Sequence, residues 1–197
     1  MRKLPNPFSS ISGDFLLEYY NTADLGACAA RTYAREHGLP MDQVEVYAGT
    51  LSVLPCSFDG AGFFDFDSQG EPCLVFEVLD EDNARTVDLA AFALADPTRF
   101  GTADGAIGLL GLTNVTNPAT WSLGALLKVH RTPLGWLKDG CRGVVITDHQ
   151  KAPAVLARAL GPIAAEDMAH GSDLTQLLCT PPVDPRNIVI PQVRRVA

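Results

Sequence analysis

The chain has 197 residues, of which 47% are hydrophobic and 19% are charged, and its formal net charge is −8. This size and composition are typical of one folded domain and exclude a chain that is disordered through its bulk. The acidic excess argues against general binding to nucleic acid or anionic membranes, which requires basic groups that neutralise phosphates. No apolar run reaches the roughly 20 residues that span a bilayer. The first ten residues also lack the apolar core of a signal peptide, so we expect a cytoplasmic protein with no membrane association.

The first predicted element is a helix over about residues 22–37. Asn21 and Thr22 are residue types that begin helices, and apolar side chains then recur at helical spacing until Gly38 and Pro40 end the run. Segments with β character follow at residues 44–47, 51–54, 63–67 and 74–79. Glycines and polar turns separate them, which predicts an antiparallel meander over about 40–84. Residues 87–94 are compatible with a strand or a helix.

The second half of the chain has a different pattern. Asn117-Pro118 is typical of a helix start, and the apolar spacing that follows predicts a helix reaching His130, with a second start at Thr132-Pro133. A strand is predicted over 143–148, a helix over 152–160 and a strand over 163–166. Strand, helix and strand with tight connections indicate a right-handed parallel βαβ unit over about 143–167.

These elements predict a mixed α/β (α+β) fold. An N-terminal helix and an antiparallel β meander are joined to a C-terminal parallel βαβ unit, within a single globular domain over residues 1–180. Residues 181–197 contain four prolines around a short apolar run and are interpreted as a C-terminal arm laid over the domain or over a partner.

The charge is unevenly distributed along the chain. Residues 36–84 hold 11 acidic residues and no Lys or Arg, so the remainder of the chain carries +3. Residues 128–158 carry a local +4. Both stretches are compatible with solvated faces that keep the protein in solution. The alternative is an acidic face that meets a basic partner, a metal ion or the basic segment of a second copy.

The five cysteines are widely spaced, and no two of them form a Cys-x-x-Cys pair. This pattern disfavours a zinc ribbon, a redox motif and a disulfide framework. We expect them to act as small buried hydrophobic residues.

The main candidate site lies at the ends of the two βαβ strands. Asp148 and His149 end the first strand, while Glu166 and Asp167 end the second, and His170 follows within one helical turn. If the strands are adjacent, their carboxyl ends meet at one edge of the sheet, where α/β proteins bind ligands. We interpret the three carboxylates as metal ligands and the two histidines as catalytic acid/base groups. The alternative interpretation makes the aspartates helix caps and the histidines loop residues.

A second candidate is Asp65 and Asp67, which project from the same face if residues 63–67 form a strand. Two such carboxylates can hold Mg²⁺ in nucleotidyl-transferring sites. The basic side chains of residues 128–158 would then have to converge on them. The simpler interpretation is a half-exposed strand with polar residues before a turn, and whether these carboxylates bind a metal is left open.

No complete catalytic motif is present, and the charge distribution is the most unusual feature. The leading hypothesis is therefore a non-catalytic interaction or accessory protein that uses the acidic face, with a protein partner or self-association, and needs no cofactor. The alternative is a metal-dependent enzyme, with Mg²⁺, acting on a phosphate-containing substrate at the βαβ strand ends.

Overall fold

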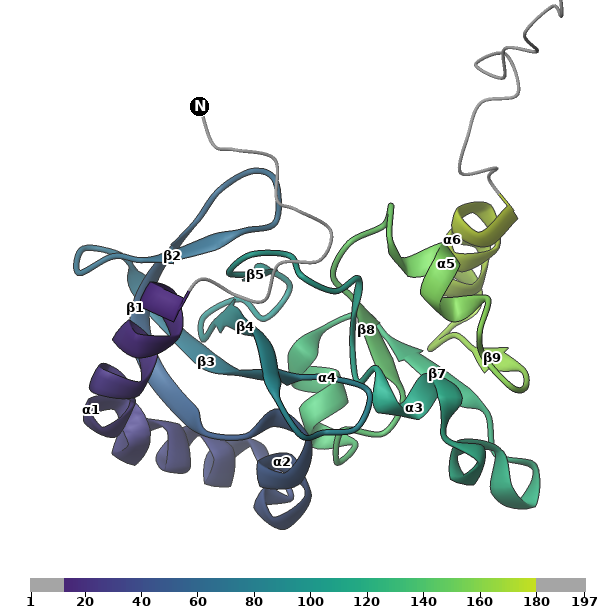
Figure 1. The fold of residues 1–197 in the computed structure, drawn as a ribbon, viewed down its shortest axis with the longest axis horizontal. Coiled ribbons are helices and arrows are strands. Elements are labelled where there is room, and N and C mark those ends of the chain that lie inside the picture. The colour runs from purple at the N-terminus through teal and green to yellow at the C-terminus, as the bar shows by residue number, and fades with distance from the viewer. Residues whose placement is uncertain (1–12, 180–197) are drawn as a thin grey trace, which may run out of the picture.

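The computed structural model describes residues 13–179 and has the predicted mixed α/β class (Figure 1). The helices are α1 (Gly13–His37), α2 (Met41–Ala48), α3 (Thr113–Thr116), the 3-10 segment η1 (Pro118–Gly124), α4 (Pro133–Lys138), α5 (Ala152–Leu156) and α6 (Met168–Cys179). The strands are β1 (Leu51–Phe58), β2 (Phe64–Phe66), β3 (Glu71–Leu79), β4 (Thr86–Ala93), β5 (Phe100–Thr102), β6 (Leu109–Leu110), β7 (Leu127–His130), β8 (Val144–Ile146) and β9 (Ile163–Ala164).

The first sheet is antiparallel, with the strand order β2-β1-β3-β4-β5. The predicted antiparallel sheet is therefore confirmed, although β3 pairs with β1 rather than with β2, and the ambiguous segment 87–94 falls in strand β4. The segment 44–47 is not a strand but part of helix α2. Val44 and Ala48 are its buried residues, and their spacing of four follows the helical period rather than a strand's alternation.

Helix α1 begins at Gly13, earlier than predicted, and packs along β1. Small residues make the approach close, because a side chain at Gly26 would overlap Ser52 and the backbone of Val53. The Ser52 hydroxyl donates a hydrogen bond of 2.9 Å to the carbonyl of Ala23. The helix is thus fixed against the sheet by backbone contact as well as by apolar burial.

The second sheet is mixed, with the strand order β6-β8-β7-β9. β7 runs parallel to both β8 and β9, while β6 is antiparallel to β8. The two strands of the predicted βαβ unit are therefore not adjacent, because β7 lies between them. β7, α4 and β8 form a βαβ unit with adjacent strands, and the chain then crosses through α5 to β9 on the other side of β7.

The helix predicted from Asn117 towards His130 is wrong beyond its first turns. The Asn117 side chain accepts a hydrogen bond from the Ala119 amide (3.0 Å), so the start signal is real. Ser122 then adopts extended backbone and Leu123 a left-handed conformation (φ 56°), which ends the helical segment. Residues 127–130 alternate as strand β7 instead.

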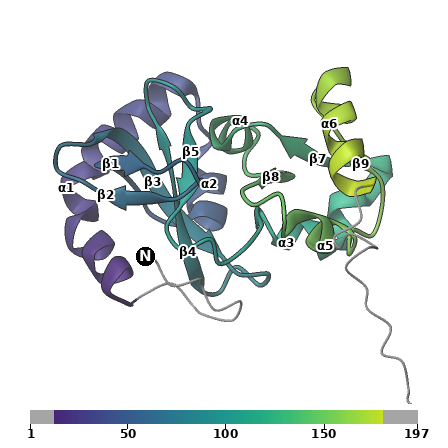
Figure 2. The same ribbon diagram turned by 90° about the horizontal axis from the view of Figure 1, so that it is seen from above.

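One apolar core joins the two sheets. Phe76 of β3, Trp136 of α4 and Val145 of β8 are buried in the same cluster, and the Phe76 and Trp136 rings lie 6.2 Å apart. Val144 faces a different cluster with Leu156 of α5 and Leu174 of α6. In consequence α4 lies on one face of the second sheet and α5 and α6 on the other (Figure 2).

Within residues 13–179, no helix combines the length and the apolar character needed to cross a membrane. The proline-rich arm predicted over 181–197 lies outside the described residues. All five cysteines are free thiols.

Candidate functional site

The parallel strands β7, β8 and β9 end at the same edge of the second sheet. The chain leaves β7 towards α4 on one face, and leaves β8 and β9 towards α5 and α6 on the other. A crevice opens where connections diverge in this way at the carboxyl ends of strands. A cavity of about 270 Å³, the strand-end cavity, lies there. Its polar lining residues are His130, Arg131, His149, His170 and Asp173.

Glu166, which follows β9, contacts both of the more buried histidines. Its carboxylate Oε1 lies 3.3 Å from His130 Nδ1, and its backbone amide donates to His170 Nδ1 at 3.3 Å. The neutral His170 ring therefore carries its proton on Nε2. Glu166 joins the end of β7 to the start of α6 and orients one ring from each.

Asp167 holds the remaining polar groups in place. Its Oδ1 accepts hydrogen bonds from the His170 amide (2.8 Å) and from Arg131 Nη2 (3.0 Å). These two donors keep the pKa of the Asp167 carboxyl below its ordinary value. Arg131 Nη1 also lies 3.7 Å from Asp173 Oδ2. The guanidinium is thus fixed at the cavity between two acidic groups.

His130 is almost fully buried, with 2% of its surface exposed. Its Nε2 donates to the carbonyl of Arg142 at 2.9 Å, and Asp139 Oδ2 lies 3.5 Å from the same atom. Burial lowers the pKa of the ring, because the charged form is separated from water. His130 is therefore a buried part of the cavity wall.

Asp148 does not join the other predicted ligands. Its Oδ1 accepts hydrogen bonds from the amides of Gln150 (2.7 Å) and Lys151 (3.2 Å) and so closes the turn before α5. Its Oδ2 lies 3.8 Å from Lys151 Nζ. His149 next to it is exposed and lines the strand-end cavity.

The structure therefore brings Glu166, Asp167 and His170 together at this edge, with His149 across the cavity. No group of three or more His, Cys, Asp and Glu side chains within residues 13–179 is placed to hold a metal ion. The carboxylates of Glu166 and Asp167 instead contact His130 and Arg131. No metal-dependent step follows from this arrangement, and the Mg²⁺ role of Asp148, Glu166 and Asp167 stays a prediction.

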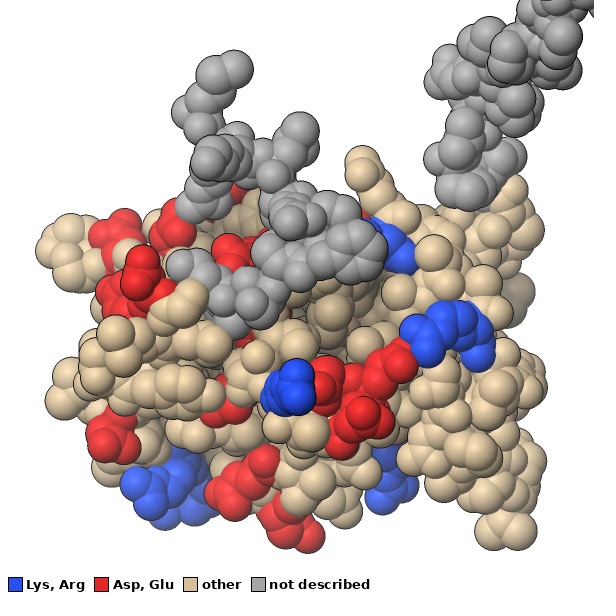
Figure 3. All heavy atoms as spheres, viewed as in Figure 1, with Lys and Arg blue, Asp and Glu red and all other residues tan. Residues whose placement is uncertain are grey.

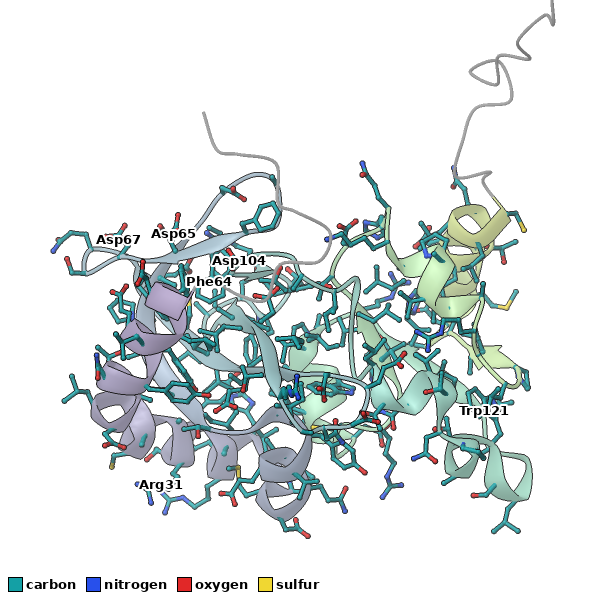
Figure 4. The ribbon with its side chains drawn as sticks, in the orientation of Figure 1. Arg31, Phe64, Asp65, Asp67, Asp104 and Trp121 are labelled. Atoms are coloured by element: carbon teal, nitrogen blue, oxygen red, sulfur yellow. The ribbon has the colours of Figure 1, made fainter. Side chains whose placement is uncertain are left out.

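Asp65 and Asp67 lie on and just after β2, at the end of the molecule opposite Trp121 (Figure 4). Asp67 Oδ1 accepts the amide of Gln69 (2.9 Å) and so closes the turn between β2 and β3. The ion pairs of the 128–158 segment are Lys128 with Asp139, Arg131 with Asp167 and Asp173, Lys151 with Asp148, and Arg158 with Glu81. These pairs use carboxylates other than those of Asp65 and Asp67.

The acidic stretch covers the part of the molecule built by the first sheet and α2, where acidic side chains predominate (Figure 3). The ion pair between Arg158 and Glu81 links this surface to the α5 region within one chain. Asp42, Glu45 and Asp82 are exposed on it.

The sequence did not single out His130, Arg131 and Asp173 as site residues. The helix that was wrongly predicted here placed His130 near its C-terminal end. A histidine at that position has a structural role, so it did not indicate a functional site. Alternation of buried Leu127 and Val129 with Lys128 was the signal that could have identified β7 and its carboxyl end.

Comparisons of the chain with protein-family models, with curated proteins and with solved structures find no match.

Proposed function

We propose that this chain binds a small molecule with an anionic group, a phosphate or a carboxylate, in the strand-end cavity. The observation that carries the proposal is the convergence of Arg131, His149 and His170 on one cavity at the diverging ends of parallel strands. Ligands of α/β proteins occupy this position in the fold. The phosphate-containing substrate of the enzyme hypothesis is retained, without the metal.

The chemistry of the lining supports an anion held against an apolar wall. Arg131 is 41% exposed and can offer guanidinium N–H groups to two oxygens at once. His170 offers Nε2–H, and the ring nitrogens of His149 can donate or accept a hydrogen bond from across the cavity. Phe100, Ile146 and Leu174 supply the apolar part. About 270 Å³ suits a small molecule at the lower end of ligand-site volumes.

Calorimetric titration of the full chain with inorganic phosphate tests the proposal. We expect saturable binding, and we expect Arg131→Gln to weaken it about tenfold or more, because a charge-assisted hydrogen bond is lost. Arg99→Gln is the matched control, since Arg99 is a similarly exposed arginine paired with Glu71 (2.7 Å) on the first sheet. Arg131→Lys keeps the charge and should retain part of the affinity.

If Arg131→Gln and Arg99→Gln weakened phosphate binding equally, the net charge of the protein and not the cavity would be what attracts the anion. Absence of saturable binding in the wild-type chain would contradict the proposal directly. Thermal unfolding of each variant checks that the fold is kept.

A second candidate function is association through the acidic face, favoured by the exposed carboxylates of Asp42, Glu45 and Asp82 and the exposed bases Lys138 and Arg142. Complementary patches of this kind steer association between copies. The triple variant Asp42→Lys, Glu45→Lys, Asp82→Lys should then shift sedimentation equilibrium towards the monomer. A wild-type chain that is monomeric at every concentration would contradict self-association.

The proposed site of action is the cytoplasm. Its reducing conditions keep thiols free, and five free cysteines support this location.

A further inference from the structure

His149 lines two cavities. One is the strand-end cavity, and the other, of about 310 Å³, lies between the first sheet and the loop after β8. Strand β5 also contributes to both, since Phe100 lines the strand-end cavity and Thr102 lines the second. At the end of β8, Ile146 lines the strand-end cavity and Thr147 lines the second. The two cavities are therefore neighbours that share His149 in their linings. We call the second one the seam cavity.

The lining of the seam cavity differs in chemistry from that of the strand-end cavity. Asp148, Gln150 and Thr147 supply a carboxylate, an amide and a hydroxyl. Asp148 Oδ1 is occupied by two backbone amides, whereas Oδ2 has its closest ionic contact at 3.8 Å, with Lys151 Nζ. A carboxylate oxygen beside an amide side chain is the donor and acceptor set that binds hydroxyl groups.

Phe63 gives the seam cavity an aromatic wall. Its ring packs against Gly105, where an added Cβ would lie only 2.7 Å from Phe63 Cε1, so the ring is held in position by the backbone. Gly105 has φ +63° and its carbonyl accepts a hydrogen bond from Lys151 Nζ. An aromatic face opposite hydroxyl-binding groups suits the C–H face and the hydroxyls of a sugar or polyol.

The spacing of the two cavities agrees with a single ligand. Phe100 and Thr102 are two residues apart on β5, so their side chains project from the same face about 7 Å apart. A ligand can therefore place its phosphate near Arg131 in the strand-end cavity. The hydroxyls of the sugar attached to that phosphate would then lie in the seam cavity, on the other side of His149.

We propose that the seam cavity is a second subsite, which binds the hydroxylated part of the ligand whose anionic group occupies the strand-end cavity. The ligand class is then a phosphorylated sugar or polyol. This inference rests on the proposed function, because it needs the anion in the strand-end cavity.

Calorimetry with three probes tests the inference on the full chain: inorganic phosphate, ribose and ribose 5-phosphate. Ribose 5-phosphate should bind roughly tenfold more tightly than phosphate, the gain of one added hydrogen bond to a charged group. Asp148→Asn and Gln150→Ala should each remove most of that gain and leave phosphate binding unchanged. Asp148→Asn keeps the Oδ1 acceptor, so the turn before α5 is preserved.

Asp67→Asn is the matched control, because Asp67 Oδ1 accepts the amide two residues ahead (2.9 Å) as Asp148 does. It should leave all three affinities unchanged. Equal affinities for phosphate and ribose 5-phosphate would overturn the second subsite while leaving the anion site intact. The subsite would also be overturned if Asp148→Asn weakened phosphate itself, or if Asp67→Asn lowered ribose 5-phosphate binding equally. Failure of phosphate and ribose 5-phosphate to bind at all would contradict the proposed function itself.

Discussion

The two sheets use their carboxylates in different ways. In the first sheet several of them close turns within a few residues, as Asp59 does with the amide of Phe63 (2.9 Å) and Asp80 with that of Ala84 (2.9 Å). In the second sheet they join elements far apart in the sequence, as Asp167 does with Arg131, 36 residues away. Part of the acidity of residues 36–84 therefore serves to close turns, whereas a few charged residues of the second sheet surround a cavity.

This difference gives the two regions separate roles. The first sheet is covered by α1 on long strands and supplies most of the apolar core. The second sheet has strands of two to four residues, and its polar loops converge at one edge. Variants in the first region and in the shared core should change the free energy of unfolding. Variants at the strand ends should change ligand affinity instead.

The largest expected effect is that of Trp136→Ala in the core shared by both sheets. Trp136 is 2% exposed, packs against Phe76 and donates to the Gly143 carbonyl (3.2 Å). Its removal should lower the free energy of unfolding by about 3–5 kcal/mol, measured by urea denaturation. Leu123→Ala, at a fully exposed side chain, is the control and should change it by less than about 0.5 kcal/mol. Separate unfolding transitions for the two sheets in the wild type would contradict a shared core.

The second effect is a pH dependence caused by Asp88, a fully buried residue of β4. Its carboxylate accepts the amides of Leu89 (2.8 Å), Asp104 (3.1 Å) and Ala106 (2.8 Å), which begin the connection to the second sheet. Burial raises its pKa from 3.8 to about 6. Between these values the folded chain binds more protons than the unfolded chain, so the free energy of unfolding falls as pH rises from about 4 to 6.

The fall attributable to Asp88 is on the order of 3 kcal/mol, from a shift of about 2 pH units. Urea denaturation at pH 4, 5, 6 and 7 measures it. Asp88→Asn cannot titrate, so the variant should lose this component of the pH dependence while remaining less stable at pH 4, because one amide loses its acceptor. An unchanged slope in Asp88→Asn would show that other groups cause it.

The smallest effect concerns affinity at the strand ends. Asp173 faces Arg131 in the strand-end cavity and should oppose an incoming anion. Asp173→Asn should therefore strengthen phosphate binding about threefold, because it removes the repulsion of one solvent-screened charge. It should leave the free energy of unfolding unchanged. Calorimetry and urea denaturation measure the two quantities. Weaker phosphate binding in this variant would indicate that Asp173 orients Arg131 instead.

The elements predicted correctly are those with local signals. The strands near 51–54, 63–67 and 74–79 and the second start at Thr132-Pro133 follow from β-branched runs, glycines and capping residues. Residues 44–47 were mispredicted because the helical spacing of Val44 and Ala48 was not recognised, and the region after Asn117 because the alternation of Leu127 and Val129 with Lys128 was not recognised. Leu123 in a left-handed conformation has no signal in the sequence, since nothing at that position favours it.

The candidate site was predicted in part. The sequence placed Glu166, Asp167, His170 and His149 at the carboxyl ends of strands, and the structure has them at one edge of the second sheet, while their role in a ligand site stays a prediction. The strand order was not predictable, so β7 and the contribution of Arg131 were missed. The histidines that contact Glu166 come from β7 and α6, and only the folded chain brings those elements together.

The most direct test of the central claim is an amide NMR titration of the full chain with inorganic phosphate. Shift changes should concentrate at residues 130–132, 147–150 and 166–174, which surround the strand-end cavity, and should saturate together. The turn at residues 67–71 and the acidic loop at residues 80–85 should stay unchanged. Shift changes centred on the first sheet, or scattered without saturation, would contradict the account.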